Sequence, residues 1–215
     1  MAAKKTPSEL IWVLIPVAAL IGVGLFVRSL GKKGKGVIMY DNGPSEFFSW
    51  IEVTRSAIST AEGFTDQFIL TDRLKMNARY LGQFILDPIR VRLEGPVFVN
   101  SWYRSEELND FLVESEDNQA VENSQHLEAD TADVHFNFEG QKRNDLLIRS
   151  VLVEQVPFDR MLIEKGTESR PDWVQLEFNS ERFENDQPQR GIILRTTNGF
   201  DWVEWSRSKA EGIYL

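Results

Sequence analysis

The sequence contains no cysteine, and only two of its 215 residues are histidines, His126 and His135. The absence of cysteine excludes disulfide bridges, thiol nucleophiles and thiolate metal ligands. Positive charge is also scarce, because 24 Lys and Arg residues stand against 33 Asp and Glu residues and the net charge is −9. Since the phosphates of nucleic acids require a basic surface, we expect no nucleic-acid partner.

The composition is nevertheless that of a folded protein. Apolar residues make up 42% of the chain, which is enough for a hydrophobic core. The length allows one domain of roughly 150 residues together with an appendage. We expect five parts: an N-terminal tail at 1–8, a transmembrane anchor at 9–30, a linker at 31–45, a main domain at 46–198 and an aromatic C-terminal tail at 199–215.

The expected anchor is an apolar run without charge from Leu10 to Val27. As a helix, its ~18 residues span about 27 Å, close to the thickness of the hydrocarbon core of a bilayer. The run is long for a cleaved signal peptide, and no small-x-small cleavage site follows it. We therefore expect an uncleaved, single-pass anchor. Lys and Arg flank both ends, and the side of the membrane that the main domain faces is left open.

Apolar periodicity predicts helices before strands in the main domain. The spacing of apolar residues predicts a helical run from Leu74 to Leu93, kinked or interrupted by Pro88, and a later helix from Asn144 to Val153. Alternation predicts strands at Val97–Val99, Ala132–Phe138, Arg160–Glu164, Trp173–Phe178 and Gly191–Thr196, and an edge strand or packing arm at Phe200–Trp205. This order indicates an α+β fold.

Three segments carry a resemblance to a known family. They are Phe48–Ser56 with its Phe-x-x-x-Glu-Val-Thr-x-Ser pattern, Ser101–Ser105 with Ser-Trp-Tyr-Arg-Ser, and Ser124–Asp133 with Ser-x-His and an Asp seven positions after the His. Together they resemble the zinc D-Ala-D-Ala peptidases, the peptidoglycan carboxypeptidases and endopeptidases that include many phage endolysins. The resemblance implies a hedgehog/DD-peptidase-like domain, in which helices flank a small antiparallel sheet.

The resemblance also implies roles for individual residues. His126 and Asp133 fall on two zinc-ligand positions, and Ser124 falls on the serine that helps to order the ligand loop. Arg104 falls on the arginine that holds the substrate and stabilises the oxyanion, with Tyr103 beside it in a supporting position.

The remaining catalytic positions depart in part from the family pattern. Asp172 falls on the position of the catalytic base, but Gln175 stands where the third zinc ligand is a histidine. A neutral amide is a poor zinc ligand compared with imidazole. His135 is an alternative third ligand, because it lies two residues from Asp133 on the same face of a strand. The other interpretation of His135 is an ordinary, half-buried strand residue.

Three further positions bear on the site. Glu177 could ligate a metal, although its alternation with Gln175 fits a strand face equally well. Two family glycines are replaced, one by Ala129 and one by Trp102, and we expect the bulky Trp102 to narrow the substrate groove.

The retained and the altered positions leave two main functions from different classes open. The first is a membrane-anchored, zinc-dependent peptidase that hydrolyses the peptide stems of peptidoglycan. The second is a catalytically inactive relative, a structural or wall-binding membrane protein such as a phage virion component, which would contact a protein partner or the wall. The expected location is a bacterial cytoplasmic membrane or a virion membrane, and zinc is the expected cofactor of the active form.

Overall fold

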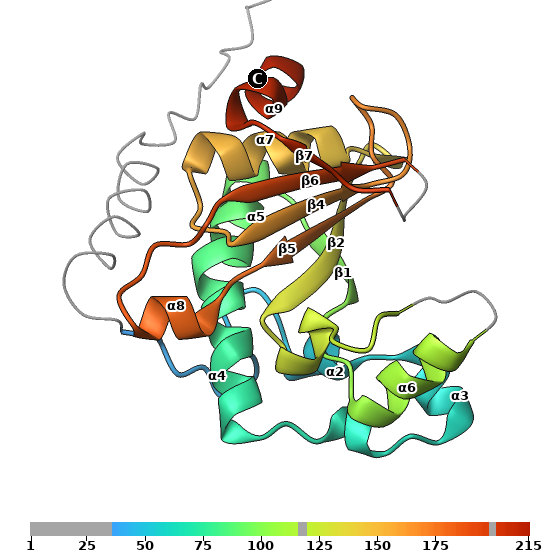
Figure 1. Cartoon of the computed structure of the whole chain (residues 1–215). Coiled ribbons are helices and arrows are strands. Elements are labelled where there is room, and N and C mark those ends of the chain that lie inside the picture. Colours follow the sequence, from blue (N-terminus) through green and yellow to red (C-terminus); the bar gives the residue numbers. More distant parts are fainter. Residues whose placement is uncertain (1–35, 116–119, 198–200) are drawn as a thin grey trace, which may run out of the picture. The chain divides into compact units, whose positions relative to one another are not determined.

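The computed structural model describes residues 36–115, 120–197 and 201–215, which belong to one compact unit (Figure 1). The expected tail at 1–8 and transmembrane anchor at 9–30 lie outside the described residues, as does the linker up to residue 35. Within the described ranges, no helix is long and apolar enough to cross a membrane.

A mixed β-sheet forms the centre of the unit. Its strands are β1 (Val97–Ser101), β2 (Thr131–Phe138), β3 (Gln141–Lys142), β4 (Arg160–Glu164), β5 (Trp173–Glu177), β6 (Ile192–Thr196) and β7 (Val203–Trp205). They follow the order β1-β2-β5-β4-β6-β7, and β3 pairs with β2. The structure confirms the α+β class, but the sheet is mixed where a small antiparallel sheet was expected, because β4 and β6 are parallel.

The parallel pair results from where β6 enters the sheet. Glu177, at the end of β5, and Ile192, at the start of β6, are both in register with Arg160. The connection between β5 and β6 therefore begins and ends at the same end of the sheet. Since β4 lies between them and is antiparallel to β5, β6 must run parallel to β4.

Helices flank the sheet and the segments that precede it (Figure 1). They are α2 (Trp50–Thr54), α3 (Ala57–Glu62), α4 (Asp72–Leu81), α5 (Asp87–Leu93), α6 (Glu106–Glu114), α7 (Asn144–Glu154), α8 (Ser180–Glu184) and α9 (Arg207–Tyr214), with 3₁₀ turns η1 (Asp66–Phe68) and η3 (Gln125–Glu128). A π-helical turn at Gly82–Leu86 joins α4 to α5, so the predicted helical run is continuous. Pro88 lies in the first turn of α5, where a missing N–H is tolerated.

The two faces of the sheet differ in burial. One face is apolar apart from the buried Arg195, and it packs on α7, which lies between α5 and α9. Its buried side chains are Val134, Phe136, Met161, Ile163, Val174, Leu176 and Ile193. The opposite face is half-buried and polar, and it carries Asp133, His135 and Gln175. Successive residues of a strand alternate between faces, so all three predicted strand residues of the site share this second face.

The segment expected as an aromatic tail contributes to the same unit. Its described residues form β7, which pairs with β6, and α9, which packs on α7. Trp205 and Tyr214 are 5% and 6% exposed, so both ends of this segment are fixed by burial.

Candidate functional site

His126 and Asp133 face each other across a short distance. The Nδ1 of His126 lies 2.6 Å from the carbonyl oxygen of Trp102, which can only accept, so Nδ1 carries the proton and donates it. The Nε2 of a neutral His126 therefore presents a lone pair to Oδ2 of Asp133, 3.4 Å away. The two side chains are 5% and 26% exposed.

The length of this contact indicates what the pair can bind. A charge-assisted hydrogen bond between a histidine and a carboxylate is usually about 2.7–2.9 Å long. Two ligands at about 2.1 Å from a tetrahedral zinc ion are separated by about 3.4 Å. Two facing acceptors need either a proton or a cation between them. The spacing of His126 and Asp133 fits a cation.

The loop that carries His126 is fixed by its own turn and by Trp102. Ser124 caps η3 and its Oγ accepts the N–H of His126 at 3.4 Å. Ala129 ends the turn with a φ of 56°, a left-handed conformation that favours glycine. The indole N–H of Trp102 donates to the carbonyl of Ala129 at 2.9 Å.

Trp102 does not narrow a groove, so that expectation was wrong. Its side chain is 1% exposed and lies in the core, with its ring edge-on to Phe48. Trp102 thus holds the His126 loop at two points, through its carbonyl and through its indole. The indole of Trp102 therefore belongs to the core beneath the site.

Arg104 is buried beside the pair. Its backbone N–H donates to the carbonyl of His126 at 3.0 Å, and its Nη1 donates to Oδ1 of Asn109 at 3.3 Å. Burial lowers the pKa of the guanidinium, and the nearby charge of Asp133 partly offsets this effect. Asn109 in turn donates to the carbonyl of Val121 at 3.1 Å. Arg104 therefore joins the His126 loop to α6 and places a positive charge near Asp133.

The amide of Gln67 fixes the backbone on both sides of Arg104. This side chain is fully buried; its Nε2 donates to the carbonyls of Thr54 and Tyr103 at 3.0 and 2.8 Å. Its Oε1 accepts the N–H of Ser105 at 2.8 Å. Tyr103 thus supports the site through its backbone. No local pattern in the sequence points to Gln67 or Asn109, because their roles depend on contacts between distant segments.

The candidates for a third ligand occupy different places. Gln175 lies directly opposite Asp133 in the β2–β5 ladder, and its Nε2 donates to Oε1 of Glu177 at 2.9 Å. His135 instead stacks on Phe98, with ring centroids 5.2 Å apart, and burial lowers its pKa. Among the residues that the structure describes, no group of three His, Cys, Asp or Glu side chains is close enough to hold a metal. The structure therefore brings Gln175, and not His135, to the pair.

A further carboxylate, Glu164, lies on the sheet face that carries Asp133 and Gln175, and no sequence pattern singled it out. Glu164 ends β4 and pairs with Trp173, so it shares the face of Asp133 and Gln175. Burial, and then the charge of Asp133, raises its pKa to about 7. Asp172 is exposed and precedes β5, and strand alternation places it on the side opposite to Gln175. A titration near neutral pH suits a group that accepts and releases a proton.

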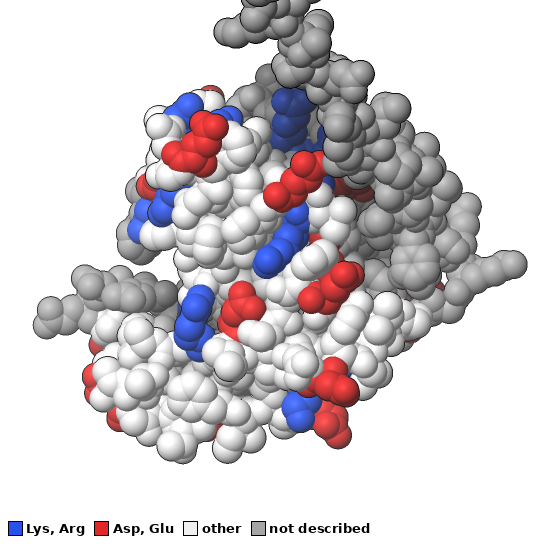
Figure 2. All heavy atoms as spheres, turned by 180° about the vertical axis from the view of Figure 1, so that it is seen from behind, with Lys and Arg blue, Asp and Glu red and all other residues white. Residues whose placement is uncertain are grey.

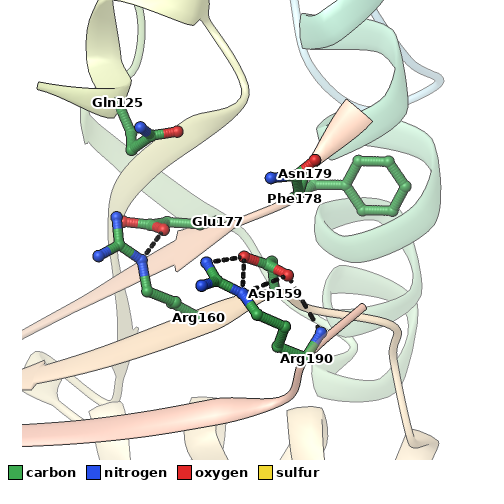
Figure 3. A pocket seen from close by; sticks show the side chains of 7 residues that line it. All are labelled: Gln125, Asp159, Arg160, Glu177, Phe178, Asn179 and Arg190. Atoms are coloured by element: carbon green, nitrogen blue, oxygen red, sulfur yellow. Dashed lines mark hydrogen bonds and ion pairs between the residues drawn. The ribbon is translucent and has the colours of Figure 1, made fainter. Parts of the chain in front are cut away.

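A polar cavity of about 250 Å³ adjoins the pair along the sheet (Figure 3). Its lining residues are Gln125, Asp159, Arg160, Glu177, Phe178, Asn179 and Arg190. Gln125 precedes His126, and Glu177 lies two residues after Gln175 on the same face of β5. The side chain of Glu177 is 5% exposed and forms an ion pair with Arg160. This ion pair engages the carboxylate that we considered as a further metal ligand.

On the side of the molecule shown in Figure 2, basic and acidic side chains are interspersed, and the described residues form no extended patch of one sign there.

Comparison with protein-family models and with curated proteins found no match to this chain.

Proposed function

We propose that this protein is a membrane-anchored, zinc-dependent peptidase that hydrolyses peptide stems of peptidoglycan. The observation that carries the proposal is the position of Nε2 of His126, which faces Oδ2 of Asp133 at the spacing of two zinc ligands. The resemblance of the Ser101–Ser105 and Ser124–Asp133 segments to the D-Ala-D-Ala peptidases supports a peptide as the substrate. The apolar run from Leu10 to Val27 supports a membrane location.

The residues present fit a zinc site with one weak position. His126 and Asp133 would hold the metal, and the amide oxygen of Gln175, opposite Asp133 in the sheet, is a candidate for a third contact. Bound zinc supplies a Lewis acid that acidifies water and polarises a carbonyl. Arg104 would hold a negatively charged oxygen of the substrate, and Glu164 would accept a proton on the same face of the sheet.

The alternative is an inactive relative that serves as a structural or wall-binding membrane protein. The observation that favours it is the engagement of Gln175, whose amide donates to Glu177. Only two side chains with good affinity for zinc then face each other. In this case the Arg104 and Gln67 network would serve the fold of the domain, and no hydrolysis of cell-wall peptides would occur.

Zinc stoichiometry distinguishes the two functions. We expect the full chain, purified without chelator, to contain about one zinc ion per molecule by elemental analysis, because two ligands and a nearby amide are arranged on one face. Dialysis against a chelator should remove the metal, and added zinc should restore it. A folded chain that binds no zinc even in excess metal would contradict the peptidase and favour the inactive relative.

The proposed proton acceptor can be tested separately from the metal. We expect Glu164→Gln to lower kcat for cell-wall peptides by roughly 10²–10⁴-fold while the zinc content is unchanged. Because the pKa of Glu164 is about 7, the unmodified chain should gain activity as the pH rises through neutrality, and the variant should lack this rise.

Asp172→Asn is the matched control, because Asp172 is an exposed carboxylate on the opposite side of β5. Its activity should stay within about twofold of the unmodified chain if Glu164 is the base. A large loss in Asp172→Asn, together with full activity in Glu164→Gln, would assign the base to Asp172 and refute the role of Glu164.

A further inference from the structure

Two arginines on the wall of the 250 Å³ cavity are held by buried carboxylates (Figure 3). Arg160 donates through Nε to Glu177, and Arg190 donates through Nε and Nη2 to Asp159. The side chains of Glu177 and Asp159 are only 5% and 2% exposed, whereas those of Arg160 and Arg190 are 32% and 43% exposed. Each guanidinium is therefore fixed at one edge and presents its other end to the cavity.

The donors that face the cavity lack partners in the described part of the chain, whereas the acceptors are already occupied. No described group accepts from Nη1 or Nη2 of Arg160 or from Nη1 of Arg190. The side chain of Gln125 has no hydrogen bond to a described residue, and the side chain of Asn179 only accepts, through Oδ1 from the N–H of Arg182, so both side-chain amides can also donate. Asp159 accepts through both oxygens, as does Glu177. The cavity is therefore suited to a ligand that brings oxygen acceptors.

The charge balance of the wall indicates which acceptor fits. Two arginines face two acids, and hydrogen bonds from Arg190 outweigh the effect of burial and hold the pKa of Asp159 below its usual value. A dianion such as phosphate would lie close to these two acidic side chains and be repelled by them. A carboxylate carries one charge, and its two oxygens match the planar fork of a guanidinium.

We propose that this cavity binds the free carboxylate of a peptide terminus. The identity of the peptide rests on the function proposed above, whereas the binding of a carboxylate does not. Glu177 and Gln175 are two residues apart, so the cavity lies ~7 Å along β5 from the position opposite Asp133. Since one extended residue spans ~3.5 Å, the peptide bond that reaches His126 and Asp133 is one or two residues from the free end. The cavity thus selects cleavage near a carboxyl terminus over cleavage inside a chain.

The test measures peptide binding to the full chain in the presence of chelator, by ligand-detected NMR. The probes are N-acetyl-D-Ala-D-Ala and the same dipeptide with a terminal carboxamide. We expect the carboxamide to bind at least about tenfold more weakly, because it loses the charge-assisted bond to the guanidinium. Arg160→Gln should weaken binding of the free acid about tenfold without changing that of the carboxamide. The control Arg149→Gln removes an exposed charge from α7, on the opposite face of the sheet, and should have no effect.

Three results would overturn the proposal: equal binding of the acid and the carboxamide, stronger binding of inorganic phosphate than of the acid, or loss of binding in Arg104→Gln but not in Arg160→Gln. If Arg160→Gln does not fold, Gln125→Ala replaces it, because the Gln125 side chain has no hydrogen bond to any residue that the structure describes. A loss of about threefold is then expected, and unchanged binding overturns the proposal. His126→Ala should keep carboxylate binding. Carboxylate binding by a chain that takes up no zinc would therefore refute the peptidase and leave the cavity assignment intact.

Discussion

Replacing Gln175 with histidine is expected to raise the affinity for zinc on the order of 100-fold. Imidazole nitrogen binds zinc far better than a neutral amide oxygen does, and position 175 lies directly opposite Asp133 in the sheet. The variant would complete a set of two histidines and one carboxylate, which is a common composition of catalytic zinc sites. The hydrogen bond to Glu177 is lost, but Glu177 keeps its ion pair with Arg160. Competition with a chromophoric chelator measures the change.

Two control variants show whether the gain comes from the assembled site. His135→Ala should leave the zinc affinity of either background unchanged, because His135 stacks on Phe98 away from the pair. His126→Ala should abolish the gain of Gln175→His, because it removes the ligand that faces Asp133. An unchanged affinity in Gln175→His would mean that His126, Asp133 and position 175 do not converge on one ion.

The second large effect concerns Asp130, and we expect Asp130→Asn to stabilise the protein at alkaline pH. Asp130 is 6% exposed, and its Oδ1 is buried and has no hydrogen-bond partner among the described residues. Burial, then the charges of Glu177 and Glu128, raises its pKa from 3.8 to about 7. Because the folded-state pKa lies above the unfolded-state value, stability is highest below about pH 4 and declines as the pH rises to about 7. The difference between the two pKa values corresponds to ~4 kcal/mol as an upper value.

Urea unfolding at two pH values measures this effect. The variant should gain up to ~4 kcal/mol in unfolding free energy at pH about 8 and change little at pH about 4. Asp87 and Glu164 also have raised pKa values, of about 6 and about 7, so only the difference between variant and unmodified chain reports on Asp130. Asp110→Asn, at an exposed position of α6, is the control and should change neither value. Equal stability of Asp130→Asn and the unmodified chain at pH about 8 would contradict the cost of the buried charge.

The parts of the fold that could be predicted are the helices and strands whose apolar residues recur with a regular spacing along the chain. The strand predicted at Arg160–Glu164 is β4 without a change of bounds, and the helix predicted at Asn144–Val153 is α7 with one further residue. Alternation of apolar residues reflects the two faces of a strand, so it also placed Asp133 and His135 on one face. The approach of His126 to Asp133 followed from a motif, and the structure brings the two within 3.4 Å.

The parts that could not be predicted depend on contacts between distant segments. The direction of β6 depends on which strand lies between β5 and β6, and no local pattern contains that information. Glu164 and Gln67 acquire their roles from neighbours more than 30 residues away, namely Asp133 and Ser105. The sequence also could not show that Trp102 turns inward, because a tryptophan beside a motif fits a groove and a core equally well.

Trp102 makes the site and the hydrophobic core thermodynamically dependent on each other. Its carbonyl selects the histidine tautomer that can ligate a metal, and its indole fixes the end of the same turn from inside the core. A cation that binds His126 only when Trp102 is packed would stabilise the folded protein. The larger the free energy of cation binding, the larger this stabilisation would be. Conversely, sequence changes that loosen the packing of Trp102 against Phe48 would weaken metal binding without altering a single ligand.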